Sequence, residues 1–81
     1  MSGSKNKIFV KAAKENILEV VKILIVDPEI DPSFKNNIAL YHALHYENKE
    51  MVELISQHPK IDFNRITGAL IEIIFTKANS I

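Results

Sequence analysis

The chain has 81 residues, with ten basic and ten acidic side chains and no cysteine. The absence of cysteine excludes disulfides and thiolate zinc sites, and it fits a reducing compartment. No signal peptide is visible, and no apolar run approaches the roughly 18 residues that a membrane span needs. The sequence therefore predicts one small domain that is intracellular, cytoplasmic or nuclear, and has no membrane partner.

The balance of charges bears on nucleic-acid binding. Because the net charge is zero and no block of like charge occurs, the positive surface typical of a nucleic-acid binder is missing. One basic stripe is visible near the start of the chain, formed by Lys5, Lys7, Lys11 and Lys14. We expect no nucleic-acid partner.

Apolar residues recur at helical spacing from the start of the chain. A first helix is expected at about 5–14, with an apolar stripe formed by Ile8, Phe9, Ala12 and Ala13. The next stretch, ILEVVKILIV at 17–26, is apolar on nearly all sides, which is typical of a helix sandwiched between neighbours. A strand is the alternative for this stretch, because it is rich in β-branched residues, but it lacks the alternation of a half-buried strand.

Three further helices are expected at about 37–46, 49–57 and 67–78. Pro28 and Pro59 follow the second and fourth helices and end them, because proline has no amide hydrogen to donate within a helix. The fold class predicted from these patterns is all-α.

A short phrase occurs twice. DPEIDPS at 27–33 returns as HPKIDFN at 58–64, 31 positions later, and the same offset pairs Ala12 with Ala43, Val21 with Val52 and Ile30 with Ile61. Self-similarity at a fixed period of this size is the signature of repeat architectures. We therefore expect one repeat domain over 1–81, with units at about 5–36 and 37–66 and a partial unit at 67–81.

The stretch AAKENILEVVKILIVDPEID resembles the ankyrin-repeat pattern. In that family a short helix ending in Ala-Ala is followed by a tight turn, a Leu-Glu-Val-Val-Lys-Leu-Leu-Leu helix and a protruding loop. The resemblance covers about 8–78 and implies an ankyrin-like solenoid of stacked helix-turn-helix repeats, with about two units plus one further helix. The glycine that usually turns between paired helices is Asn16 in one unit and Glu47 in the other. Because glutamate adopts a left-handed backbone poorly, the second turn is expected to be less regular.

The resemblance implies a protein-protein interaction module that binds a partner through its concave helix face and loop tips. Side chains at positions that face the partner in the family are Phe34, Lys35, Asn37, His45, Tyr46, His58, Arg65, Thr67 and Thr76. Tyrosine and arginine are enriched among the residues that contribute most to binding energy. The alternative is that these side chains are an ordinary solvated surface.

Catalysis and metal binding have weak signals. His42 and His45 are three positions apart, which is not the spacing of the helical metalloprotease motif, and a zinc site needs three or four converging ligands. The carboxylates are scattered, and neither glycine belongs to a phosphate-binding loop. We expect no enzyme activity, no cofactor and no metal.

The last expected helix has two apolar stripes. Leu70, Ile73 and Ile74 can pack inward, whereas Ile71, Phe75 and Ala78 form a second stripe at helical spacing. An uncovered apolar patch usually marks an interaction site. We therefore expect an identical chain, a further repeat or a partner protein to cover it. The alternative function is a self-associating structural unit, or a fragment of a longer array, that dimerises through the C-terminal helix.

Overall fold

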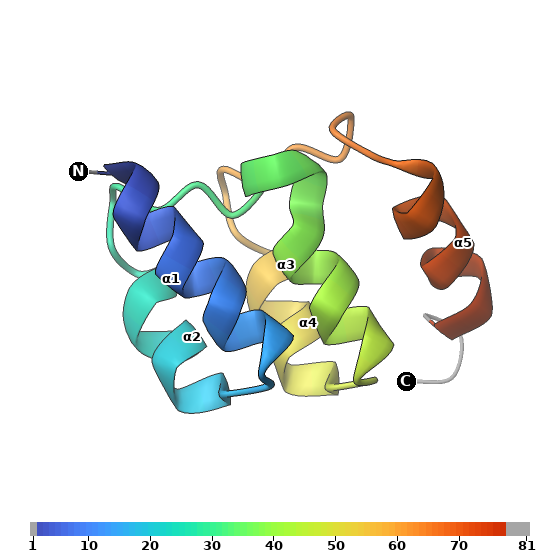
Figure 1. Ribbon diagram of the computed structural model, residues 1–81, viewed down its shortest axis with the longest axis horizontal. Helices are drawn as coiled ribbons and strands as arrows, with labels where there is room; N and C mark the ends of the chain where they lie inside the picture. The colour runs from blue at the N-terminus through green and yellow to red at the C-terminus, as the bar shows by residue number, and fades with distance from the viewer. Residues whose placement is uncertain (1, 78–81) are drawn as a thin grey trace.

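The computed structural model describes residues 2–77, which form five α-helices and no strand (Figure 1). The helices are α1 (Ser2–Lys14), α2 (Leu18–Ile25), α3 (Phe34–His45), α4 (Lys49–Ser56) and α5 (Gly68–Lys77). The all-α prediction is confirmed, and the stretch ILEVVKILIV is helical. Within the same residues, no helix combines the length and the apolar character that a membrane crossing requires.

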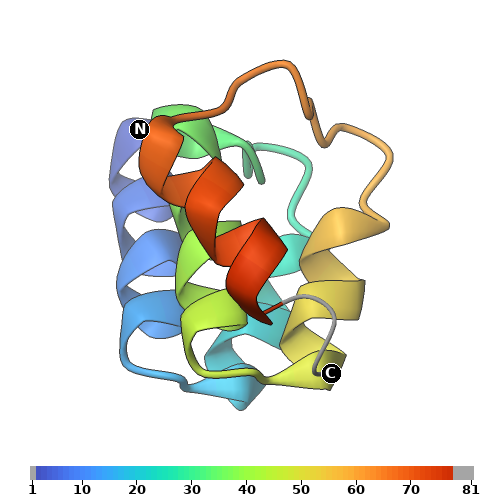
Figure 2. The ribbon, with the colours of Figure 1, turned by 90° about the vertical axis from the view of Figure 1, so that its right-hand side faces the viewer.

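The helices form two layers. α1 runs antiparallel to α2, and α3 runs antiparallel to α4 (Figure 1). α1 packs against α3 and α3 against α5, while α2 packs against α4 behind them (Figure 2). The two helix pairs therefore stand side by side, and α5 extends the first layer beyond the second pair.

The core lies between the two layers and between the pairs. Its buried apolar side chains are Phe9, Ala12, Ala13, Val21, Ile25, Ile30, Ala39, Leu40, Ala43, Leu44, Met51, Ile55, Leu70 and Ile73. Four of them are alanines on α1 and α3. Because the distance between packed helices depends on the side chains at the contact, these alanines let the two helices approach closely.

The turns within the two pairs are alike. Asn16 and Glu47 both have a left-handed backbone, with φ of 59° and 53°. The amide of Ile17 donates to the Ala12 carbonyl at 2.8 Å, and the amide of Asn48 donates to the Ala43 carbonyl at 3.1 Å. The expectation of a less regular second turn is therefore wrong. The hydrogen bonds that close the helix end offset the cost of about 1–2 kcal/mol of a left-handed glutamate.

The two loops after α2 and α4 also share their hydrogen bonds. Pro28 and Pro59 each lie three residues beyond the end of a helix, as expected. The Asp31 side chain accepts from the Ser33 amide at 2.9 Å, and the Asp62 side chain accepts from the Asn64 amide at 3.0 Å. These aspartates satisfy local backbone donors where the chain reverses, as the repeated phrase predicts.

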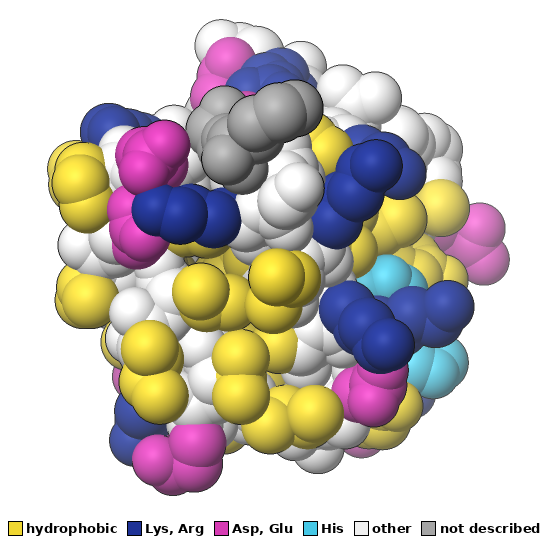
Figure 3. All heavy atoms as spheres, turned by 60° about the vertical axis from the view of Figure 1, so that its left-hand side comes forward, with side chains coloured by type: hydrophobic (Ala, Val, Ile, Leu, Met, Phe, Trp, Pro, Cys, Tyr) yellow, Lys and Arg dark blue, Asp and Glu magenta, His cyan; other side chains and the backbone are white. Residues whose placement is uncertain are grey.

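The placement of α2 differs from the expectation of a sandwiched helix. α2 contacts α1 and α4, and Ile23 and Val26 on its outer side are 68% and 79% exposed. Ile8 of α1, expected in the buried stripe, is 54% exposed. The reason is the position of this pair at the edge of the described structure. The residue 31 positions after Ile8 is Ala39, which is fully buried between the pairs. Figure 3 shows apolar side chains gathered on this edge.

Several helix ends differ from the expected bounds. α1 begins at Ser2 instead of residue 5, and α3 begins at Phe34 instead of residue 37. Residues 35–37 at the start of α3 have left-handed φ between 54° and 64°, so the right-handed helix starts after them. The ends of α2, α4 and the start of α5 lie within one residue of expectation. Residue 78, expected to end the last helix, lies outside the described residues.

The burial contrast between two isoleucines provides a test of this packing. Ile55 is fully buried, so Ile55→Ala should lower the free energy of unfolding by about 2–5 kcal/mol through lost burial and a residual cavity. Ile23→Ala removes the same atoms from an exposed position and should change the free energy of unfolding by only about 0.5 kcal/mol. Urea denaturation of both variants measures the difference, and equal losses would contradict the assigned faces of α2 and α4.

Candidate functional site

Four hollows lie along the layer formed by α1, α3 and α5, and they share lining residues. Lys14 lines two of them, Lys35 lines two, and Tyr41 lines three. The hollows therefore adjoin one another along this layer, and we call the surface that contains them the groove face. The largest has a volume of about 290 Å³ and lies between α1 and the start of α3; we call it the α1–α3 groove.

The α1–α3 groove combines cations with apolar surface. Its lining comprises Lys7, Val10, Lys11, Lys14, Glu15, Phe34 and Lys35. The ammonium nitrogen of Lys35 lies 5.8 Å from the centre of the Phe34 ring, which is within the range of a cation–π contact. Figure 3 shows lysine and histidine side chains gathered on one side of the molecule, next to the exposed apolar edge.

A second hollow, of about 250 Å³, is lined by aromatic rings and Lys14. The rings of Tyr41 and His45 are stacked, with centres 6.4 Å apart, and His45 meets Tyr46 edge-on at 5.6 Å. Successive turns of α3 place these rings on one face of the helix, because residues three and four apart are neighbours. Tyr46 and His45 are exposed, so this cluster presents flat, rigid surface to solvent.

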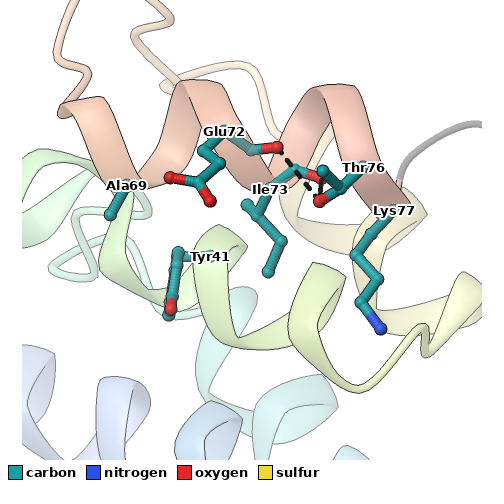
Figure 4. Close-up of a pocket in the computed structure, with 6 residues that line it drawn as sticks. All are labelled: Tyr41, Ala69, Glu72, Ile73, Thr76 and Lys77. Atoms are coloured by element: carbon teal, nitrogen blue, oxygen red, sulfur yellow. Dashed lines mark hydrogen bonds between the residues drawn. The ribbon is translucent and has the colours of Figure 1, made fainter.

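The third hollow, of about 230 Å³, lies between α3 and α5 (Figure 4). Ile73 points from α5 toward α3 and is buried, and Tyr41 of α3 lines the same hollow. The Thr76 hydroxyl donates to the Glu72 carbonyl at 3.0 Å, so it is bonded within its own helix. Thr67 borders the fourth and smallest hollow, and its hydroxyl accepts from the Leu70 amide at 3.2 Å, which caps α5.

Six residues expected to face a partner therefore line the groove face: Phe34, Lys35, His45, Tyr46, Thr67 and Thr76. Sequence reasoning did not include Lys7, Lys11, Lys14 and Tyr41 in this set. The available signal was the spacing of the three lysines at i, i+4 and i+7, which places them along one side of α1. From the sequence, these lysines are weighed only as a basic stripe for a nucleic acid, because nothing in the sequence places Lys35 beside them.

Asn37 lies elsewhere than expected. Its side chain is fully buried and donates to the carbonyl oxygens of Asp62 at 2.8 Å and Arg65 at 2.6 Å. The prediction that Asn37 faces a partner is therefore wrong. Its amide side chain ties the start of α3 to the loop after α4, where an unpaired backbone carbonyl would be costly.

His58 and Arg65 are also engaged within the chain. The Nδ1 atom of His58 accepts from the Lys60 amide, so Nε2 carries the proton and donates to the Ile25 carbonyl at 3.2 Å. The Arg65 guanidinium lies 3.2 Å from the Asp31 carboxylate. Both side chains are half-buried and join the second loop to the first pair, so their first role is structural.

Lys5 does not belong to the lysine stripe. Its ammonium group contacts Glu29 at 2.7 Å and Asp27 at 3.0 Å, and these hydrogen bonds raise the pKa of Lys5 above its usual value. The Glu29 amide and Lys5 lower the pKa of Asp27 in turn. Lys5 therefore neutralises the first loop, away from the groove face.

His42 is the one groove residue with a shifted pKa. Burial lowers the pKa of His42 below its usual value of 6.5, and the nearby charges of Lys14 and His45 lower it further. The described residues contain no group of three histidine, cysteine or acidic side chains arranged to hold a metal ion. What this face offers chemically is directed hydrogen bonding, positive charge and aromatic surface.

No protein-family model, curated protein or solved structure matches this chain. Its function must therefore be inferred from the geometry of the groove face.

The pKa of His42 provides a test of the electrostatics of this face. Because this pKa is lower in the folded chain, the unfolded chain takes up the proton first, and stability is lost as the pH falls through about 6.5. Lys14→Gln removes one cause, so the pKa of His42 should rise while burial keeps it below its usual value. NMR titration of the imidazole resonances measures this, with Lys49→Gln on α4 as the control. An unchanged pKa in the Lys14 variant would contradict the assignment.

Proposed function

We propose that this chain is a non-catalytic protein-interaction module, a stack of ankyrin-like helix pairs that binds another protein through its groove face. The observation that carries the proposal is the groove face itself. Cationic, aromatic and apolar side chains share one rigid helical layer there, a combination that favours macromolecular recognition.

The repeat character of the stack has support in the hydrogen bonds. Asn6 and Asn37 are 31 positions apart, and each bonds the backbone of the aspartate in a following loop. The Asn6 side chain accepts from the Asp31 amide at 2.8 Å, and the Asn37 side chain donates to the Asp62 carbonyl. The two bonds run in opposite directions, but they join equivalent residues at the same offset of 31, which favours two copies of one unit over two unrelated helix pairs.

The second pair is held to the first by polar contacts along its whole edge. Lys22 and Glu50 are paired at 2.8 Å, the Asn48 side chain donates to the Asn16 side chain at 2.8 Å, and the Asp62 amide donates to the Ser33 hydroxyl at 2.7 Å. Together with the buried alanines, these contacts fix one pair against the other. A partner would therefore bind a preformed surface, which lowers the entropic cost of association.

Replacing Lys35, His45 and Tyr46 together by alanine tests the proposal. Ligands for the wild-type chain would be selected from a random peptide display library, and their affinities measured by calorimetry. The triple variant should bind them at least about tenfold more weakly, because loss of one aromatic contact residue typically costs about 1–3 kcal/mol.

The matched control replaces Glu19, Lys49 and Glu53, exposed residues of the second layer, by alanine and should leave the affinity unchanged. Circular dichroism verifies that both variants are folded. Selected ligands that bind the groove variant as tightly as the wild type would contradict the proposal.

A second candidate function, self-association through α5, has an observation of its own. Leu70 and Ile73 of α5 are buried against α3, whereas Ile71 and Phe75 are 41% and 76% exposed. Ile74 is 38% exposed, so the expectation that it packs inward is wrong. Ala78, the third residue expected in the outer stripe, lies outside the described residues. Two exposed large apolar side chains four positions apart on one helix favour a second copy of the chain as their cover.

Sedimentation equilibrium tests this second function. The wild-type chain should form a dimer, and Ile71→Lys combined with Phe75→Glu should yield a monomer of unchanged helicity, because charges in a buried interface oppose association. The control combines Ile8→Lys with Ile23→Glu at the opposite edge and should remain dimeric. A wild-type chain that stays monomeric at high concentration would exclude self-association through α5.

A further inference from the structure

We propose that the α1–α3 groove binds an acidic segment of the partner protein that also carries an apolar side chain. The inference rests on the proposed function and adds the chemistry of the ligand. Lys7, Lys11 and Lys14 from one side of α1 and Lys35 from the start of α3 all line this groove.

The four lysines give the groove a positive charge that its one acidic lining residue balances only in part. Glu15 is the acidic residue in the lining, and its carboxylate lies 3.9 Å from the Lys11 ammonium, at the outer limit of an ion pair. Exposed pairs of this kind contribute little energy and are screened by salt. The contribution of Lys14 to the lowered pKa of His42 agrees with a positive potential at this end of the layer.

The position of Lys35 depends on an unusual backbone. Residues 35–37 are three consecutive non-glycine residues with left-handed φ of 54°, 56° and 64°. Such residues persist only where the surrounding structure over-determines them, and they concentrate at functional sites. Here the buried side chain of Asn37 anchors the segment, and Lys35 lines the α1–α3 groove beside Lys7, Lys11 and Lys14.

The apolar side chains that line the groove indicate that the ligand also carries an apolar side chain. Val10 and Phe34 are half-buried and line the groove between the lysines. A cavity of about 290 Å³ can admit one or two side chains. In a segment where carboxylates flank a leucine or phenylalanine, the carboxylates would pair with the lysines and the apolar side chain would pack against Val10 and Phe34.

The distribution of charge favours an acidic protein segment over a nucleic acid. The second layer has a slight excess of the opposite sign, because α2 and α4 carry Glu19, Glu50 and Glu53 against Lys22 and Lys49. The first loop carries Asp27 and Glu29, which form ion pairs with Lys5. A long polyanion that extended beyond the groove would meet these carboxylates, whereas a short acidic segment would not.

The probe is a fluorescent peptide of about 12 residues in which glutamates flank leucines, and the control peptide has glutamine at every glutamate position. Fluorescence anisotropy should show binding of the acidic peptide that weakens as sodium chloride rises, because salt screens the lysines. The glutamine peptide should bind at least about tenfold more weakly. Chemical-shift changes in the ¹⁵N spectrum should centre on Lys7, Val10, Lys11 and Lys35.

Charge reversal locates the binding. The double variant Lys11→Glu with Lys35→Glu should bind the acidic peptide at least about tenfold more weakly. Lys49→Glu reverses a charge on α4, in the other layer, and should leave the affinity for this peptide unchanged. Equal binding of the two peptides, or an affinity insensitive to the Lys11 and Lys35 reversals, would overturn the inference. Tighter binding of an oligothymidine of similar length would overturn it in favour of a nucleic acid.

The two proposals fail in different ways. Library-selected ligands that need Lys35, His45 and Tyr46 but bind as well after their acidic residues are changed to amides would preserve the proposed function and overturn the acidic ligand. Selected ligands that ignore the groove altogether would overturn both proposals.

Discussion

The buried side chain of Asn37 connects the start of α3, beside the groove face, to the loop after α4. It donates to two carbonyl oxygens of the loop after α4, and its own backbone is part of the left-handed segment that leads into α3. Left-handed residues without glycine cost roughly 1–2 kcal/mol each, so the segment needs such an anchor. Without it, the loop could separate from α3, and Lys35 would no longer be held beside the lysines of α1.

The groove face and the second layer differ in charge although the whole chain is neutral. Lysines gather where α1 meets α3, and glutamates gather on α2 and α4. The two layers expose opposite sides of the molecule, so the sign of each side depends on the residues of its own helices. An overall net charge therefore says little about the local field that a partner would meet.

The two edges of the stack share a property that its middle lacks. Ile8 and Ile23 at one edge and Ile71 and Phe75 at the other are exposed, whereas Ala39, Met51 and Ile55 between the pairs are buried. A helix at either edge has a neighbour on one side only, so uncovered apolar surface concentrates at the edges. Binding through the groove face and association through an edge use different surfaces and are compatible with each other.

The sequence by itself determined the helices, their order and the repeated loop, because apolar periodicity, proline and the Asp31 and Asp62 turns act over a few residues. It also indicated that Ile71 and Phe75 of α5 would stay uncovered, but it placed Ile74 inward, and Ile74 is exposed. Tertiary structure decided that Glu47 adopts the same left-handed turn as Asn16, since closing the hydrogen bonds of a helix end outweighs a local preference. It also decided that Asn37 is buried and that Lys35 lies beside Lys7, Lys11 and Lys14. These outcomes depend on which surfaces meet when one helix pair packs on the other. The spacing of residues along the chain predicts local structure and does not predict contacts between distant segments.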